Sequence, residues 1–174
     1  MTGSSVERQA LWAQVLEIYA VPDVAQACLL LQDRFGVDVM LILFSLALGR
    51  CERQPLDLVE TAQADTLIAN WRASVIQPLR GVRRTLKGGF DRIPLPLSDP
   101  IRYVIKRTEL AAEEIEFDAL VAHHAERRQL SAGRGWAVPA IEAVLAHFGG
   151  MRAADPDAEC ADAVALIAEA AERA

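Results

Sequence analysis

The stretch LLLQDRFGVDVMLILFSLALGR, residues 29–50, is the most apolar part of the chain. Its second half, residues 39–48, is apolar throughout except for Ser45. Because a helix needs about 20 apolar residues to cross a bilayer, this shorter run predicts a buried helix from Val39 to Leu48 and no membrane span. We expect this helix to be the centre of the fold.

The polar residues inside the stretch predict a break between two helices. Gly36 stands where a helix ends in left-handed backbone, and Asp38 stands where the next helix needs a side-chain cap. In so apolar a segment we expect Asp33 or Arg34 to be substantially buried and hydrogen-bonded, because an unpaired buried charge is costly. Alternatively, Asp33 and Asp38 could flank a metal ion or share a proton, although capping already accounts for Asp38.

Capping signals and apolar spacing along the rest of the chain predict an all-α protein, a single domain over residues 1–174 with about seven helices. Trp12, Leu16 and Tyr19 form one stripe on the first helix. The other expected helices run from an Asp23 cap to Phe35, from Val39 to a stop at Gly49, over 57–62, over 65–87 with a kink or division at Pro78, from Pro100 to Gln129 after a loop at 88–99, from Val138 to Phe148 after a loop at 131–135, and, after Asp155-Pro156, from Ala158 to Arg173.

Composition narrows the class of protein. The 174 residues are 52% apolar and 24% charged, an ordinary globular balance. A net charge of −6 argues against nonspecific nucleic-acid binding, which needs a basic face. The cysteines number three, Cys28, Cys51 and Cys160, without a C-x-x-C pair. Together with an N-terminus unlike a signal peptide, they predict a reducing, cytoplasmic location.

No motif predicts a reaction, a cofactor or a metal. The chain has no G-x-S-x-G elbow, phosphate loop or G-x-G-x-x-G fingerprint. Its histidines are His123, His124 and His147, and the Glu-x-x-His pairs of helical di-iron sites are absent. Whether the protein is an enzyme, and which cofactor it would use, therefore stays open, and we expect no metal site.

The strongest charge asymmetry lies on the helix before Gly88. Residues 72–92 hold six positive side chains and one negative one. At about 100° per residue, one arc of this helix is apolar and the adjacent arc is basic. The basic arc consists of Arg72, Arg80, Arg83, Arg84 and Lys87. Forked arginines bind phosphate or carboxylate, so the arc predicts either an anion site or pairing with Glu109, Glu113 and Glu116 of the following helix.

Several blocks of the chain together resemble a bacterial family of uncharacterised conserved proteins, a domain-of-unknown-function family. The first block comprises Leu11-Trp12, Tyr19, Val24, Ala27-Cys28-Leu29, Leu31-Gln32-Asp33-Arg34, Gly36, Asp38-Val39 and residues 41–44; looser blocks include Trp71-Arg72, Pro78-Leu79-Arg80, Arg83-Arg84, Leu86-Lys87, residues 109–113 and Ile115-Glu116. The likeness spans residues 11–120 and leaves the helices at 137–173 outside it. It implies a small helical cytoplasmic protein without an established activity. The family usually has Asn where this chain has Met40.

Three functional hypotheses follow. The leading one is a non-enzymatic binding or adaptor protein that recognises an anionic small molecule or an acidic protein surface through the basic arc. The second is an enzyme or cofactor-binding protein with a pocket formed by Trp12, Tyr19, Asp33, Arg34, Asp38 and Trp71, beside Arg72. The third is a structural subunit of a larger assembly. The sequence does not specify the oligomeric state.

Overall fold

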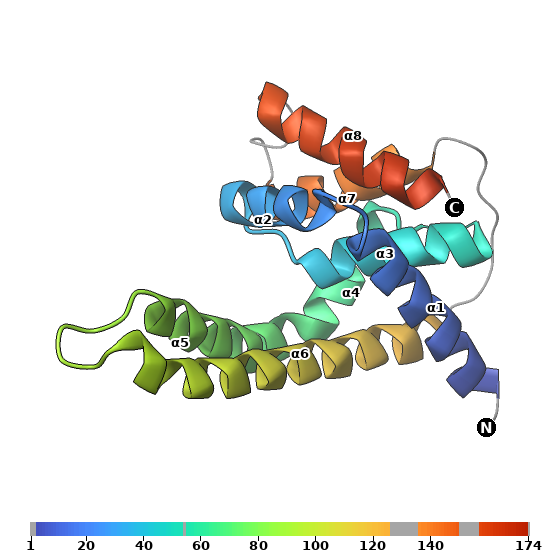
Figure 1. Cartoon of the computed structure of the whole chain (residues 1–174). Coiled ribbons are helices and arrows are strands. Elements are labelled where there is room, and N and C mark those ends of the chain that lie inside the picture. Colours follow the sequence, from blue (N-terminus) through green and yellow to red (C-terminus); the bar gives the residue numbers. More distant parts are fainter. Residues whose placement is uncertain (1–2, 54, 126–135, 150–156, 174) are drawn as a thin grey trace. The chain divides into compact units, whose positions relative to one another are not determined.

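A computed structural model describes residues 3–53, 55–125, 136–149 and 157–173, with the side chains of residues 3–6 left out (Figure 1). The described residues are predominantly helical, and their only β feature is an isolated bridge between Phe90 and Ile93. The predicted all-α class is therefore confirmed. Within the described residues no single helix is long and apolar enough to cross a membrane, and the first two helices pass such a test only together, across a 92° bend.

The helices fall into two compact units. The core unit is Met1–Asp65 with Val121–Ala174, and the hairpin unit is Thr66–Leu120. The helices are α1 Gly3–Tyr19, α2 Val24–Phe35, α3 Val39–Glu52, α4 Leu58–Trp71, a π-helical segment Arg72–Ile76, α5 Gln77–Lys87, α6 Leu95–Ala125, α7 Ala137–Gly149 and α8 Ala158–Glu172. Both α4 and α6 begin in one unit and end in the other.

The core unit is built around α3. Every residue from Met40 to Gly49 is buried, as expected for a helix that is apolar on all sides. The flanking helices α1, α7 and α8 pack against it (Figure 1). Among the fully buried side chains are Phe44, Ile18 and Leu31. The apolar stretch of residues 39–48 is therefore the centre of this unit, as the sequence predicts.

The junction between α2 and α3 follows its local sequence. Gly36 has a φ of 70°, and its N–H donates to the carbonyl of Gln32 at 2.9 Å. Such left-handed backbone strongly favours glycine, so Gly36 ends α2 as predicted. Asp38 is buried, and its Oδ1 accepts a hydrogen bond from the Leu41 N–H at 3.1 Å. Asp38 is thus the N-cap of α3, which confirms the second half of the prediction.

The first two helices form as predicted, but the predicted cap of the second one is wrong. Among the described side chains of α1, Leu11, Val15 and Ile18 are buried, whereas Leu16 and Tyr19 are exposed. The stripe Trp12, Leu16 and Tyr19 has the same helical spacing but is offset by about 100°, so spacing alone could not choose between the two faces. Asp23 makes no side-chain capping bond, because its own backbone turns left-handed with a φ of 68°.

The end of α3 also differs from the prediction. The helix continues through Gly49 to Glu52, and Arg53 takes the left-handed position with a φ of 60°. Gly49 instead provides space: a Cβ atom there would lie 2.2 Å from the ring of Trp136, which precedes α7. The glycine therefore allows the indole to pack directly on the α3 backbone.

The helices of the middle region begin and end elsewhere than predicted. The helices expected over 57–62 and from 65 onward are one helix, α4, which opens with a reciprocal cap: Glu60 N–H donates to Asp57 Oδ1 at 2.8 Å, and Asp57 N–H to Glu60 Oε2 at 3.1 Å. A π-helical segment then precedes Pro78, with Gln77 N–H bonded to the carbonyl of Arg72. This wider turn accommodates the proline, which cannot donate to a helix.

The helices α6 and α8 begin close to the loops that the sequence predicts before them. The helix α6 begins at Leu95, five residues before Pro100, with Ser98 Oγ donating to the Leu95 carbonyl at 3.2 Å. It is described to Ala125, so the predicted extension to Gln129 and the loop at 131–135 lie outside the described residues. Asp155-Pro156 also lies outside them. The N-cap of α8 is Asp157, whose Oδ1 accepts from Cys160 N–H at 2.9 Å.

Candidate functional site

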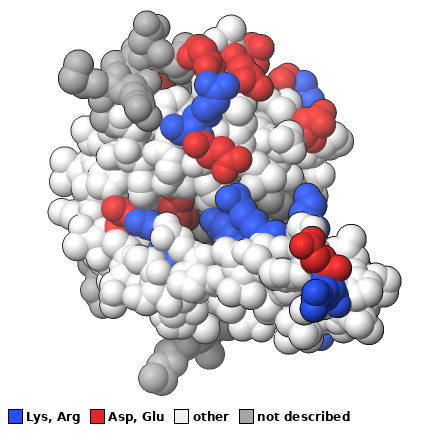
Figure 2. Space-filling view, turned by 90° about the vertical axis from the view of Figure 1, so that its left-hand side faces the viewer, with Lys and Arg blue, Asp and Glu red and all other residues white. Residues whose placement is uncertain are grey.

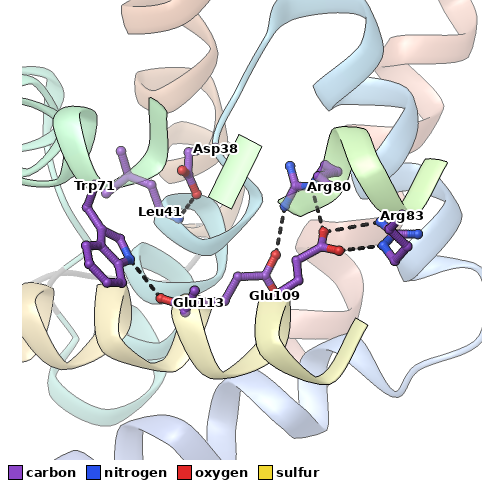
Figure 3. A network of polar contacts seen from close by, with 8 residues as sticks. Asp38, Leu41, Trp71, Arg80, Arg83, Glu109 and Glu113 are labelled. Carbon is purple, nitrogen blue, oxygen red and sulfur yellow. Dashed lines mark hydrogen bonds and ion pairs between the residues drawn. The ribbon is translucent and has the colours of Figure 1, made fainter. Parts of the chain in front are cut away.

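The basic arc of α5 faces α6 at two of its members. Arg80 donates from Nε to Glu109 Oε1 at 2.9 Å and from Nη2 to Glu113 Oε1 at 2.7 Å. Arg83 donates from Nε to Glu109 Oε2 and from Nη2 to Glu109 Oε1, the second bond at 3.2 Å. Figure 3 shows both guanidinium groups converging on the Glu109 carboxylate. The acidic side of α6 therefore binds these arginines within the hairpin unit, one of the two outcomes that the sequence left open.

Burial makes this cluster a structural one. The Glu109 side chain is 6% exposed, against 20% for Arg80 and 28% for Arg83. Burial would raise the pKa of Glu109, but hydrogen bonds from Arg83 and Arg80 outweigh it and hold that pKa below its ordinary value. At neutral pH, Glu109 is thus an ionised carboxylate that joins α6 to α5.

Other cations at this end of the hairpin unit are exposed. We call the exposed residues Arg84, Lys87, Arg92 and Lys106 the basic end. Residues 84–106 carry five positive and two negative side chains, a net charge of +3. The same part of the sequence also exposes large apolar side chains, with exposed fractions of 46–62%. These are Phe90, Ile93, Leu95 and Tyr103. In Figure 2, Lys and Arg atoms border broad areas of uncharged atoms. Arg72, the remaining member of the basic arc, is half-buried on the π-helical segment.

The prediction that Asp33 or Arg34 is buried is wrong. Both are exposed, because the buried side of α2 comprises Val24, Ala27, Cys28 and Leu31, and the positions after Leu31 turn outward. Arg34 is nonetheless paired: it donates to Asp157 Oδ2 at 2.8 Å and to Glu159 Oε2 at 3.0 Å. It therefore binds the acidic first turn of α8, where Asp157 is the cap.

The remaining residues of the predicted pocket have separate surroundings. Trp12 is half-buried, with the Arg8 guanidinium 5.6 Å from its ring centroid, and Tyr19 is 41% exposed. Trp71 Nε1 donates to the Ala112 carbonyl at 3.0 Å, which joins the end of α4 to α6 (Figure 3). Trp71 belongs to the hairpin unit, and the other five belong to the core unit. The pocket itself stays a prediction.

The core unit contains two acid–imidazole pairs that no sequence pattern predicts. His124 Nε2 lies 2.9 Å from Glu52 Oε2, and His147 Nε2 lies 2.8 Å from Asp65 Oδ2. The partners are 72 and 82 residues apart, so no local pattern could reveal them. Within the described part of the chain, no group of three or more His, Cys, Asp or Glu residues could hold a metal ion.

These features define a small all-α protein with a helical hairpin. Glu109 joins the two helices of the hairpin, and the basic end of the hairpin exposes both cations and large apolar side chains. The family model described as Protein of unknown function (DUF2390) matches residues 10–120, well over half of the chain. The chain belongs to this family, which confirms the expected membership of a domain-of-unknown-function family. No curated protein and no solved structure matches the chain.

Proposed function

We propose that the protein is a non-enzymatic binding or adaptor protein whose recognition surface is the basic end of the hairpin unit. The observation that carries this proposal is the mixture of exposed cations with exposed large apolar side chains, among them Phe90 and Tyr103. Protein interfaces combine an apolar centre with charges that select and orient the partner. The mixture therefore suits an acidic protein segment with apolar anchors.

A small anion fits this surface less well. Forked arginines are the best carboxylate and phosphate ligands, and the forks of Arg80 and Arg83 are already bound to Glu109. The side chains of the basic end are instead spread over the end of α5, the following turn and α6. Such a spread favours an extended acidic surface over one compact ligand.

The test is binding of a fluorescently labelled acidic amphipathic peptide, with glutamates on one helical face and leucines on the other, followed by fluorescence anisotropy. The double variant Lys87→Glu/Arg92→Glu should weaken binding by at least about 10-fold, because attraction becomes repulsion. Added inert salt should weaken wild-type binding. The matched control, Arg53→Glu/Arg173→Glu, makes the same change in charge at exposed sites of the core unit and should bind within about 2-fold of wild type.

Parallel arms distinguish other ligands. A rise in melting temperature with inorganic phosphate but no peptide binding would replace the protein partner with a small anion. Binding only to phosphatidylglycerol vesicles would replace it with a membrane surface. Equal peptide affinity for the wild type and the Lys87→Glu/Arg92→Glu variant, or no peptide binding by the wild type, would overturn the proposal.

A further inference from the structure

One side of α6 carries a regular row of uncharged, exposed side chains. The α6 row has spacings of four, three, four, three and four residues and consists of Leu97, Ile101, Val104, Thr108, Ala111 and Ile115. Its four large members are 53–69% exposed. Single exposed apolar side chains are ordinary, but a row repeating every 3.5 residues over about 27 Å is typical of a helix that packs against another helix.

A second row follows on α5 and the segment before it. The α5 row, with spacings of four, three and four residues, consists of Val75, Leu79, Val82 and Leu86, of which Val82 is 49% exposed and the others are half-buried. The α5 row lies about 100° around its helix from Arg80 and Arg83, and the α6 row lies about 120° around its helix from Glu109, with the same rotational sense along the chain. Because α5 and α6 run antiparallel (Figure 1), these similar offsets place both rows on the same side of the hairpin. This double row resembles one half of a four-helix bundle.

We infer that this face binds a second copy of the chain, with the two α6 helices antiparallel about a twofold axis. The proposed register centres the twofold axis between Thr108 and Ala111. Val104 then packs against Ile115 of the second copy, and Thr108 packs against Ala111. The small central residues permit close approach of the helices. The Thr108 hydroxyl already donates to the Val104 carbonyl at 3.0 Å. Burying this hydroxyl in the interface therefore leaves no donor without an acceptor.

Charge complementarity supports this arrangement. Arg107 and Glu114 flank the α6 row on the side away from α5, at the g positions of its heptads. The antiparallel register brings Arg107 of one copy beside Glu114 of the other, and the twofold axis repeats the pair. A parallel register would instead place Arg107 opposite Ala112 and Glu114 opposite Ala119, with no complementary charges.

The flanking charges also argue against a lipid surface on this face. Helices that lie on anionic membranes carry Lys and Arg beside their apolar stripe. Here Glu114 and Asp118 lie beside the α6 row and are exposed, so an anionic bilayer would repel that end. A second copy offers an opposite charge to both Arg107 and Glu114, whereas an anionic membrane attracts only the positive residue.

The test is analytical ultracentrifugation of the full chain over a range of concentrations. We expect a wild-type dimer, and Val104→Glu should raise its dissociation constant at least about 30-fold, because each interface contains the position twice. Leu110→Glu is the matched control: Leu110 is 47% exposed on α6 but lies outside the row, so its dimer should persist. Circular dichroism checks that both variants remain folded.

A charge exchange tests the register itself. Arg107→Glu alone and Glu114→Arg alone should each weaken the dimer by roughly 3- to 30-fold, because like charges then meet twice. The double variant should restore the dimer, and an equimolar mixture of the two single variants should form heterodimers. A wild type that stays monomeric at every concentration, a dimer indifferent to Val104→Glu, or a double variant as weak as the singles would overturn the inference. None of these outcomes bears on Lys87 and Arg92, so the proposed function is tested separately.

Discussion

At the scale of single residues, Glu109 joins the helices α5 and α6 of the hairpin unit. It is nearly buried and accepts hydrogen bonds from both Arg80 and Arg83. Removing a carboxylate from such a cluster leaves two cations with lost bonds, which costs more than the pair itself contributes. The sequence placed these residues on facing helices, but it could not show which carboxylate would be buried.

We predict that Glu109→Gln lowers the free energy of unfolding by about 1–3 kcal/mol at neutral pH. Because the folded-state pKa of Glu109 is depressed, its stabilisation is fully present above the unfolded-state pKa of about 4.3 and is lost as pH falls through the folded-state value. The difference between wild type and variant in urea unfolding should therefore shrink in acid. Exposed Glu142→Gln is the control and should change little at any pH. A Glu109→Gln deficit that is constant down to the lowest pH would contradict this role.

Single residues also show where prediction from sequence succeeds. Gly36 and Asp38 were predicted correctly because a helix stop and an N-cap depend on residues within about four positions. The burial of Asp33 or Arg34 was predicted wrongly because it depends on the rotation of α2 against α8, which no local pattern specifies. The pairs His124–Glu52 and His147–Asp65 depend on packing between distant helices in the same way.

At the scale of helices, the core unit contains a close approach of Trp136 to Gly49 of α3. The apolar run predicted α3 itself, yet glycine was interpreted as its end because helix stops and close contacts both use this residue. The position of Trp136, 87 residues away in the sequence, shows that Gly49 allows a close contact and does not end the helix. On α1, similarly, two apolar stripes fit one helical period, and the sequence does not specify which of them is buried.

We predict that Gly49→Ala destabilises the protein by about 1–3 kcal/mol, because its Cβ would overlap the Trp136 ring, 2.2 Å away. The matched control is Gly81→Ala, also inside a helix, where a Cβ would meet nothing within 4 Å. That substitution should stabilise the protein by about 0.5–1 kcal/mol, since alanine is the better helix former. Equal effects of the two substitutions in thermal unfolding would show that Trp136 does not restrict position 49.

At the scale of the whole chain, the two units have very different shares of buried apolar residues. Most of the buried hydrophobic side chains belong to the core unit, whereas those of the hairpin unit are Ile68, Ile76, Ala112, Phe117 and Leu120. A segment with few buried contacts opens at a lower free energy than the core of the same molecule. The all-α class followed from composition and capping, but this division did not, because the sequence shows helices and not which of them share a core.

We therefore predict that amide hydrogens of α3 exchange most slowly with solvent and those of α5 much faster, as measured by hydrogen exchange with mass spectrometry. If the double row binds a second copy, dimerisation stabilises only the folded hairpin, so higher protein concentration should slow exchange in α5 and α6. It should leave α3 unchanged, because α3 is buried among other helices of the core unit. The Val104→Glu variant supplies the control: its α5 exchange should be fast and independent of concentration. Equal protection of α3 and α5 in that monomeric variant would mean that the two units open together and that the hairpin is no weaker than the core.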